Sequence, residues 1–353
     1  MQHLVIVESP TKVKTIGKYL GKEYEVIASV GHIRDLPKSE KEAINIEDGF
    51  VPKYVVSTEK RKVVTEIKKK ASQTKHVILA TDPDREGEAI AWHIQQTANL
   101  KDPDRIVFHE ITKEAVQEAL KTPRKIDQSL RQSQEARRVL DRLFGYTLSK
   151  LIWTKVRYGL SAGRVQSPAL RILMEREREI QKFKPETYWE IHGIFKRQDN
   201  NEYIAECEKV LHKKEEVDDI LAKAKKKGWQ VQKVQERVQK RNPRPPFITS
   251  TLQQAASNIL SWSPSYTMRT AQRLYEAGHI TYMRTDSTNL SAAAHAMSKK
   301  YITEIYGEKE YNRTMYKTKS KSAQEAHEAI RPTNISSTYC ALCLLYTSPS
   351  PRD

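Results

Sequence analysis

The sequence predicts a protein with an α/β part followed by mainly α-helical parts, and three observations indicate this class. About the first 120 residues alternate short β-branched runs with helical patterns, which is typical of a sheet covered by helices. Residues 121–180 are helical in pattern and basic, with 14 Lys and Arg against 6 Asp and Glu. After a proline-rich stretch at 243–246, a helix, helix, strand order indicates a winged-helix arrangement.

Each expected element follows from a local pattern of apolar spacing and capping residues. The expected strands are 4–7, 77–80, 188–195, 203–206 and 280–285. The expected helices are 12–20, 86–96, 213–227, 249–260 and 264–277. Thr249 or Ser250 is expected to cap the fourth helix, Ser263 with Pro264 to start the fifth, and Gly278 to end it.

The charge of the chain indicates a polyanionic partner. Its 353 residues include 61 Lys and Arg against 44 Asp and Glu, a net charge of +17. Nucleic acid is the first candidate partner and an anionic membrane surface the second. No run approaches the roughly 18 to 20 apolar residues of a membrane span, and the first residues lack a signal-peptide pattern.

The cysteines indicate a reducing compartment. Cys207, Cys340 and Cys343 are too few for a disulfide framework, so we expect the protein in the cytoplasm. Cys340 and Cys343 form a CxxC pair, but the chain lacks the cysteines for a four-cysteine zinc site.

Acidic residues follow two of the expected strands directly. Glu8 comes after the first strand, and Asp82 and Asp84 come after the second. The carboxyl ends of parallel strands form a common crevice, so these acids are expected to converge on one hard cation such as magnesium. The alternative is a solvated acidic loop that caps the helix beginning at Glu86, where acids favour the N-terminal dipole.

A tyrosine and an arginine share one expected strand. In 280–285, Tyr282 and Arg284 would lie on the same face, where both can meet one phosphate. An unperturbed tyrosine has a pKa of about 10, so its attack needs a cation to stabilise the phenolate and the phosphorane charge, as Arg284 can. The alternative is a stacked surface pair. The chain has no G-x-x-x-x-G-K-[ST] nucleotide loop.

Basic residues in the helical part indicate a path for a phosphate backbone. Arg131, Arg138 and Arg142 fall at i, i+7 and i+11 on one helix face. The glycines in 159–167 permit close backbone approach, and polar side chains there can donate hydrogen bonds to phosphates. The alternative for the basic helix is an ordinary solvated face.

Together these stretches resemble the type IA DNA topoisomerases over about residues 1–333. The stretches that carry the resemblance are 8–12, 29–37, 81–88, 134–143, 159–167, 278–287 and 326–333. The resemblance implies a Rossmann-like Toprim domain at 1–120, a helical DNA-groove domain at 121–187, a partial arch domain at 188–242, a winged-helix-like domain with the catalytic tyrosine at 243–335, and a foreign or truncated tail at 336–353.

The resemblance also implies roles for individual residues. Tyr282 is the nucleophile, Arg284 assists it, Glu8 passes a proton to the leaving 3′ oxygen, and Lys12 lies against the scissile phosphate. The implied magnesium ligands are Glu8, Asp82, Asp84 and Glu86. The implied DNA contacts are His32, Arg137, Arg138, Asp141, Arg142, Gly163, Arg164, Val165, Gln166, Ser167, Arg284 and His327.

The implied activity is ATP-independent relaxation of negatively supercoiled DNA through single-strand cleavage, a 5′-phosphotyrosine link, strand passage and religation. We expect single-stranded and negatively supercoiled DNA as partners, no nucleotide cofactor, no membrane, a monomeric state and a nucleoid-associated place in the cytoplasm. Because the family continues beyond the length of this chain, the alternative is a truncated fragment that binds or cleaves single strands without full relaxation.

Three rival classes explain only part of the sequence. Another Toprim enzyme, such as a primase or a nuclease, explains the acids but not the stretch 278–287. A noncatalytic DNA-binding fragment explains the charge. A basic protein of anionic membranes explains the net charge alone.

Overall fold

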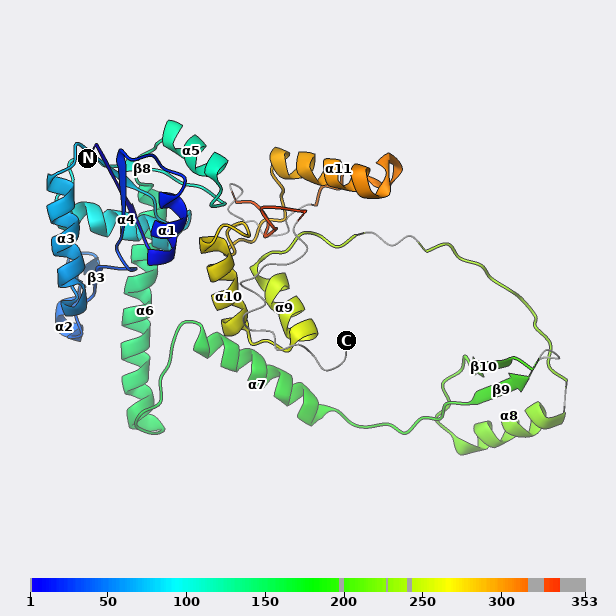
Figure 1. Cartoon of the computed structure of the whole chain (residues 1–353). Helices are drawn as coiled ribbons and strands as arrows, with labels where there is room; N and C mark the ends of the chain where they lie inside the picture. The colour runs from blue at the N-terminus through cyan, green and yellow to red at the C-terminus, as the bar shows by residue number, and fades with distance from the viewer. Residues whose placement is uncertain (1, 197–199, 227, 240–242, 317–326, 337–353) are drawn as a thin grey trace, which may run out of the picture. The chain divides into compact units, whose positions relative to one another are not determined.

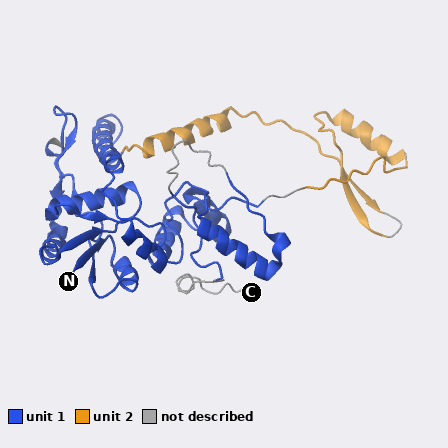
Figure 2. Ribbon diagram, turned by 90° about the horizontal axis from the view of Figure 1, so that it is seen from above, with its two compact units in different colours: residues 1–161, 243–353 blue, residues 162–242 orange. Residues whose placement is uncertain are grey.

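The computed structural model describes residues 2–196, 200–226, 228–239, 243–316 and 327–336 (Figure 1). The chain divides into two compact units, 1–161 with 243–353 and 162–242 (Figure 2). The five domain limits given above stay predictions. Cys340, Cys343 and nearly all of the expected tail lie outside the described residues.

The first unit is organised around a four-stranded parallel sheet. Its strands are β1 His3–Val7, β2 Tyr24–Ala28, β7 His76–Leu79 and β8 Asp104–Arg105, in the order β2-β1-β7-β8. Strand β1 is apolar from Leu4 to Val7 because helices cover both faces of the sheet. Val5 and Val7 enter one apolar cluster, whereas Leu4 and Ile6 enter another. The predicted α/β sheet is therefore confirmed.

Two sets of helices supply these clusters. α3 Arg61–Ser72 and α4 Arg85–Ala98 pack on the face that carries Leu4 and Ile6. The other face is covered by three helices: α1 Pro10–Gly17, α5 Lys113–Lys121 and α10 Pro264–Glu276. Helix α10 leads into the stretch 278–287 that carries Tyr282, which we call the tyrosine motif. This motif therefore shares one apolar core with the sheet that carries the acidic motif, residues 81–88.

Short elements and one long helix complete this part of the unit. α6 Gln128–Lys155 packs against α4, and the Asp127 side chain caps its first turn. The short elements are β3 Arg34–Asp35, α2 Glu40–Ala43, β4 Ile44–Asn45, β5 Val51–Pro52, β6 Val55–Val56 and η1 Thr58–Lys60. Pairs β3–β6 and β4–β5 are antiparallel.

The segment after residue 243 contains helices followed by an irregular segment. Its elements are α9 Thr249–Leu260, α10, α11 Ala292–Tyr306 and η2 Glu308–Glu310. The expected strand at 280–285 is wrong. Thr281 N–H donates to the carbonyl of Arg331, but Tyr282 N–H donates to that of His109, so consecutive residues bond different segments and no ladder continues.

The predicted end of α10 at Gly278 is confirmed, but the predicted cap of α9 is wrong. Gly278 has φ +83°, and a Cβ there would lie 2.5 Å from the Ile111 carbonyl oxygen, so only glycine fits. The N-cap of α9 is Ile248, whose N–H donates to the Thr251 hydroxyl at 3.0 Å. The Thr249 hydroxyl instead donates to the carbonyl of Met283.

The second unit is small. It contains α7 Gln166–Lys182, an antiparallel pair of β9 His192–Lys196 with β10 Glu202–Glu206, and α8 Lys214–Lys226. The expected strand at 188–195 begins later because Trp189 forms only an isolated bridge, with Leu211. No helix in the described parts of either unit is long and apolar enough to cross a membrane.

A buried arginine ties the loop after β7 to the sheet. Arg105 and Glu88 are both fully buried, and Arg105 Nε lies 3.2 Å from Glu88 Oε1. The Arg105 guanidinium also donates to the carbonyls of Thr81 at 2.8 Å and Asp82 at 2.7 Å. Arg124 bonds the same carboxylate of Glu88 from the outside. The Arg105 network therefore fixes the backbone that presents the acidic motif.

We expect Arg105→Met to lower the free energy of unfolding by about 3–5 kcal/mol, because it leaves the Glu88 carboxylate buried without its inner partner. Urea unfolding followed by circular dichroism measures the loss. Arg124→Met is the control, since the Arg124 side chain is 39% exposed and its loss lets water reach Glu88. Equal losses of unfolding free energy for the two variants would contradict the role of Arg105 as the inner partner of Glu88.

Candidate active site

The carboxyl end of the sheet holds two carboxylates and one buried ammonium. Lys12 is fully buried at the start of α1, and its Nζ lies 3.0 Å from Glu8 Oε2 and also bonds Asp82 Oδ1. The Asp82 N–H donates to Glu8 Oε1 at 2.7 Å. The parallel sheet thus brings together the acids that the sequence separates by 74 residues.

The charges in this cluster depend on one another. Burial raises the pKa of Asp82 to about 6, against the attraction of Lys12, which lowers it. Burial alone lowers the pKa of Lys12, but the attraction of Asp82 and Glu8 outweighs it, so the pKa is raised. Lys12 therefore stays charged and holds both carboxylates.

The tyrosine motif meets the acidic motif at Asp84. Tyr282 is 2% exposed, and its hydroxyl donates to Asp84 Oδ2 at 2.5 Å across 198 residues of sequence. Arg284 Nη1 lies 3.7 Å from the same oxygen. Tyr282 and Arg284 converge as their spacing suggested, although their segment is not a strand. The other Asp84 oxygen caps α4 by accepting from Gly87 N–H at 2.8 Å.

Burial controls the protonation of this tyrosine. Burial first, and then the charges of Asp82 and Asp84, raise the pKa of Tyr282 far above its usual range. Its ring packs 5.1 Å from that of Tyr275 and 6.2 Å from that of His327. Burial lowers the pKa of His327, which is 6% exposed. In this arrangement the phenol is neutral and donates its proton to Asp84.

A cavity of about 690 Å³ opens onto these groups. Its wall includes four expected site acids together with His32 and Arg284. One face of α10 also lines the cavity, with Met268, Gln272 and Glu276 at i, i+4 and i+8 and Arg269 beside them. Sequence reasoning missed this face, although its helical spacing is readable once α10 is known to cover the cavity.

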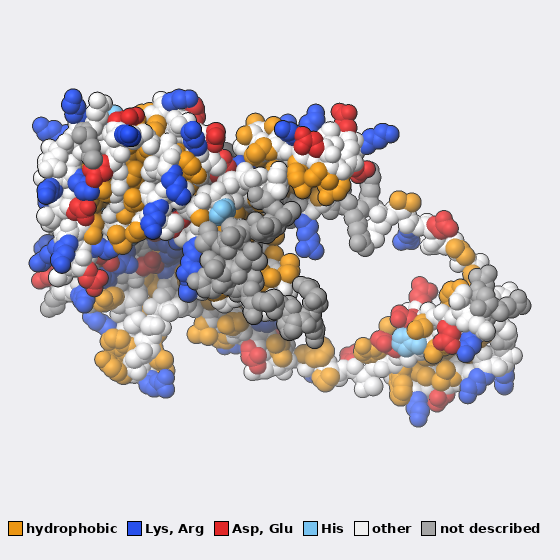
Figure 3. Space-filling model, viewed as in Figure 1, with side chains coloured by type: hydrophobic (Ala, Val, Ile, Leu, Met, Phe, Trp, Pro, Cys, Tyr) orange, Lys and Arg blue, Asp and Glu red, His pale blue; other side chains and the backbone are white. Residues whose placement is uncertain are grey.

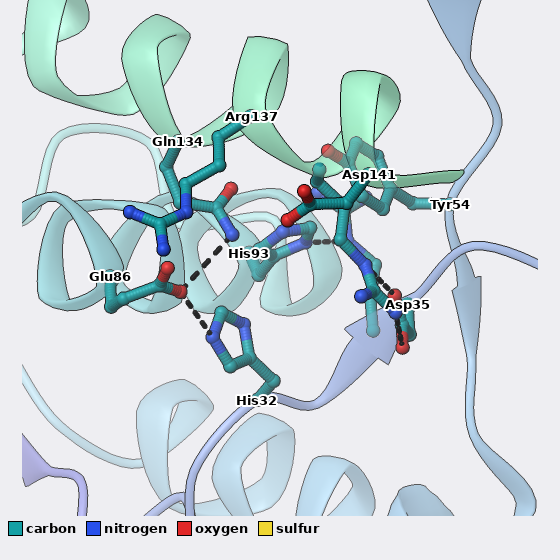
Figure 4. Close-up of a pocket in the computed structure, with 10 residues that line it drawn as sticks. His32, Asp35, Tyr54, Glu86, His93, Gln134, Arg137 and Asp141 are labelled. Atoms are coloured by element: carbon teal, nitrogen blue, oxygen red, sulfur yellow. Dashed lines mark hydrogen bonds and ion pairs between the residues drawn. The ribbon is translucent and has the colours of Figure 1, made fainter. Parts of the chain in front are cut away.

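A second cavity, of about 360 Å³, lies between the sheet domain and α6 (Figure 4). It brings together four of the expected DNA contacts with four residues that sequence reasoning missed. The expected contacts are His32, Arg137, Arg138 and Asp141. The missed residues are Arg34, Tyr54, His93 and Gln134.

Glu86 joins the two cavities. His32 Nε2 and Gln134 Nε2 both lie 3.1 Å from Glu86 Oε2 (Figure 4). The hydrogen bond from His32 lowers the pKa of Glu86, against the effect of burial. Glu86 is therefore directed toward His32 rather than toward Asp82.

The arginines of the expected basic stripe on α6 bind other groups of the first unit. Arg138 pairs with Asp35, with Nε 2.9 Å from Oδ1, and Arg142 donates to the Pro37 carbonyl at 2.7 Å. Arg131 lies over the Trp92 ring, 4.6 Å from its centroid. On the face shown in Figure 3, lysine and arginine side chains are scattered among acids over the first unit rather than gathered in one stripe.

The remaining expected DNA contacts belong to the second unit. They are Gly163, Arg164, Val165, Gln166 and Ser167. These residues form the turn into α7, where Ser167 N–H donates to the Gly163 carbonyl at 3.0 Å. A Cβ at Gly163 would meet only the end of the flexible Gln166 side chain, at 2.9 Å, so this turn does not require glycine.

The comparisons with known proteins agree with this architecture. Residues 3–111 match the family model of the Toprim domain, and residues 125–341 match that of DNA topoisomerase. The chain therefore belongs to the type IA DNA topoisomerase family, and the predicted family is confirmed.

Individual relatives support the same conclusion. The chain is 49% identical to DNA topoisomerase 1 of Campylobacter jejuni, over 96% of this chain and 51% of that protein. It resembles the structure of full-length topoisomerase I from Thermotoga maritima with a TM-score of 0.78 and 42% identity, over 94% of this chain and 55% of that one. The chain thus spans about half the length of these relatives.

The acidic side chains of the site have the chemistry of metal ligands. Toprim domains in general bind divalent metal ions. Glu8, Asp82, Asp84 and Glu86 offer only carboxylate oxygens, which suit a hard cation. Within the described ranges no three His, Cys, Asp or Glu side chains lie close enough together to bind one ion. In this arrangement Glu8 binds Lys12, Asp84 binds Tyr282 and Glu86 binds His32.

We expect acid to destabilise the first unit through His93, which is 1% exposed and accepts from Arg34 Nε at 2.7 Å. Burial lowers the pKa of His93 to about 3, from 6.5 when exposed. The unfolded chain therefore binds the proton more readily. The stability that neutral His93 contributes is complete above pH 6.5 and is lost as pH falls toward 3.

Urea unfolding at several pH values measures this effect. Near pH 5 the expected loss of stability, due to protonation of His93 in the unfolded chain, is about 2 kcal/mol, and His93→Gln should remove that part of the pH dependence. His192→Gln, at an exposed position of the second unit, is the control and should leave the profile unchanged. A His93→Gln profile identical to that of the unchanged chain would refute the prediction.

Proposed function

We propose that this chain carries out the cleavage and religation steps of ATP-independent DNA relaxation. The observation that supports this most is the hydrogen bond from Tyr282 to Asp84, beside Arg284 and at the edge of a 690 Å³ cavity. It joins a candidate nucleophile, a proton acceptor and a cation at one point. A primase or a nuclease has no use for such a tyrosine.

The proposed reaction begins with attack of the Tyr282 hydroxyl on a phosphate of one DNA strand. Asp84 lies at hydrogen-bond distance to take the phenolic proton, which the raised pKa of Tyr282 otherwise retains. Arg284 stabilises the charge that develops on the phosphate oxygens. The bond to the 3′ oxygen breaks, the Glu8 carboxylate relays a proton from water to that oxygen, and a 5′-phosphotyrosine forms.

Religation reverses these steps. The 3′ hydroxyl returns its proton to Glu8 and attacks the phosphotyrosine, and Tyr282 regains its proton from Asp84 and leaves. The ester conserves the energy of the broken phosphodiester, so no nucleotide is consumed. Passage of the other strand while the ester persists changes the linking of the DNA.

Several residues bind and orient the strand in this proposal. Lys12 neutralises the buried acids behind the scissile phosphate, and His327 borders Tyr282. His32, Arg137, Arg138 and Asp141 receive a neighbouring nucleotide in the second cavity. The remaining proposed contacts are Arg142, Gly163, Arg164, Val165, Gln166 and Ser167.

The proposed metal is magnesium. Asp82, Asp84, Glu86 and Glu8 would hold it, and it would supply positive charge beside the phosphates and the leaving oxygen. We further propose single-stranded and negatively supercoiled DNA as substrates, a monomeric protein without a nucleotide cofactor, and a nucleoid-associated place in the cytoplasm.

A denaturing gel tests the central step. Incubation with end-labelled single-stranded DNA followed by denaturation should leave label on the protein, and Tyr282→Phe should abolish it while binding persists. Tyr306→Phe is the control, because Tyr306 is 65% exposed on α11. Relaxation of supercoiled plasmid is measured in parallel, since an adduct without relaxation would indicate cleavage without strand passage. Label on Tyr282→Phe equal to that on the unchanged chain would exclude this nucleophile.

Replacing both aspartates of the acidic motif tests the metal. Asp82→Asn with Asp84→Asn should leave single-strand binding intact but slow both adduct formation and resealing at least tenfold, because Asp84 no longer carries the phenolic proton and the cation loses two carboxylates. Asn is as good a helix cap as Asp, so α4 should keep its start. The readout is the rate at which adduct disappears after magnesium is added, with Asp219→Asn of α8 as control. Magnesium-independent resealing by the unchanged chain would rule out the metal's role.

A further inference from the structure

The face of α10 that lines the larger cavity carries one cation that the reaction above does not use. Thr267, Ala271 and Tyr275 bury one side of the helix in the core. This fixes the rotation of α10 and turns Arg269 toward the cavity that also contains Arg284. Arg269 itself is exposed.

The acids around this cavity already have partners. Lys12 pairs with Glu8 and Asp82. Asp84 lies beside Arg284, and Glu86 accepts from His32. Each of these four acids therefore has a partner other than Arg269.

The other polar residues on the α10 wall also have partners. Gln272 Nε2 donates to Glu276 Oε1 at 2.9 Å, within the same helix. Within the described part of the chain, the Arg269 guanidinium forms no ion pair or hydrogen bond. A full positive charge with five N–H donors thus lines the same cavity as Arg284 without a partner of its own among the described residues.

We propose that Arg269 binds a phosphate of the DNA strand next to the phosphate attacked by Tyr282, from the part of the cavity wall that α10 forms. This rests on the proposed function. A strand in the cavity would place one phosphate at Tyr282 and Arg284. Arg269 is the other arginine among the residues that line the cavity, so it is the candidate partner of the next phosphate. Arg269 presents the planar fork that suits phosphate oxygens. It is a DNA-positioning residue that does not touch the reacting atoms.

The test compares Arg269→Met with the unchanged chain in binding a labelled single-stranded oligodeoxynucleotide of mixed sequence, without metal, over a range of salt. Loss of one phosphate contact should reduce the slope of log affinity against log salt by about 0.7 and weaken binding about fourfold at about 0.15 M salt. Arg269→Lys keeps the charge and should restore the slope. Arg273→Met, one turn along α10 and outside the cavity lining, is the matched control.

The covalent-adduct assay separates positioning from chemistry. Arg269→Met should require more DNA for half-maximal adduct but reach the same adduct level at saturation. An unchanged slope and unchanged half-maximal concentration would overturn the proposal, as would a loss equal to that of Arg273→Met. If the unchanged chain binds DNA but forms no adduct, the proposed function fails instead, and the salt slope still decides the role of Arg269.

Discussion

The structure of this site depends on how the first unit compensates acids that it withdraws from water. Glu8 and Asp82 stand at the ends of neighbouring parallel strands, and both reach the Nζ atom of a fully buried Lys12. Two carboxylates this close repel each other, and burial adds a desolvation cost. Lys12 offsets part of both costs, and the pKa of Asp82 stays raised because burial outweighs the attraction of Lys12.

A second buried acid, Glu88, also needs a compensating cation, and Arg105 supplies it in the core. Glu88 is the last acid of the motif, and it points into the core, where Arg105 compensates it. The other donors of Arg105 hold the carbonyls of Thr81 and Asp82. One acidic stretch thus serves two purposes, since Glu88 anchors the loop and Asp84 is left to meet Tyr282. The same short segment, residues 81–88, thus fixes its own backbone through Glu88 and presents Asp84 to Tyr282.

The tyrosine is held in a closed, neutral arrangement. Its hydroxyl is buried on Asp84, and its backbone is fixed by the carbonyl of His109. Binding a DNA strand must therefore replace protein contacts that are already made. Arg284 can act both in this closed arrangement and with DNA bound, because its side chain is 56% exposed and lies beside the carboxylate that receives the phenolic proton.

Local patterns in the sequence were sufficient to predict strands β1 and β7 of the sheet, several helices, the acids after these strands and the proximity of Tyr282 and Arg284. These features depend on apolar periodicity, glycine and motif spacing, which are properties of short segments. The strand at 280–285 could not be judged in this way, because its N–H groups bond segments near residues 109 and 331. The face of α10 toward the cavity, the burial of Glu88 on Arg105 and the partners of the α6 arginines also required the tertiary structure. Each depends on which distant surface a side chain meets, and only packing of the whole unit decides that.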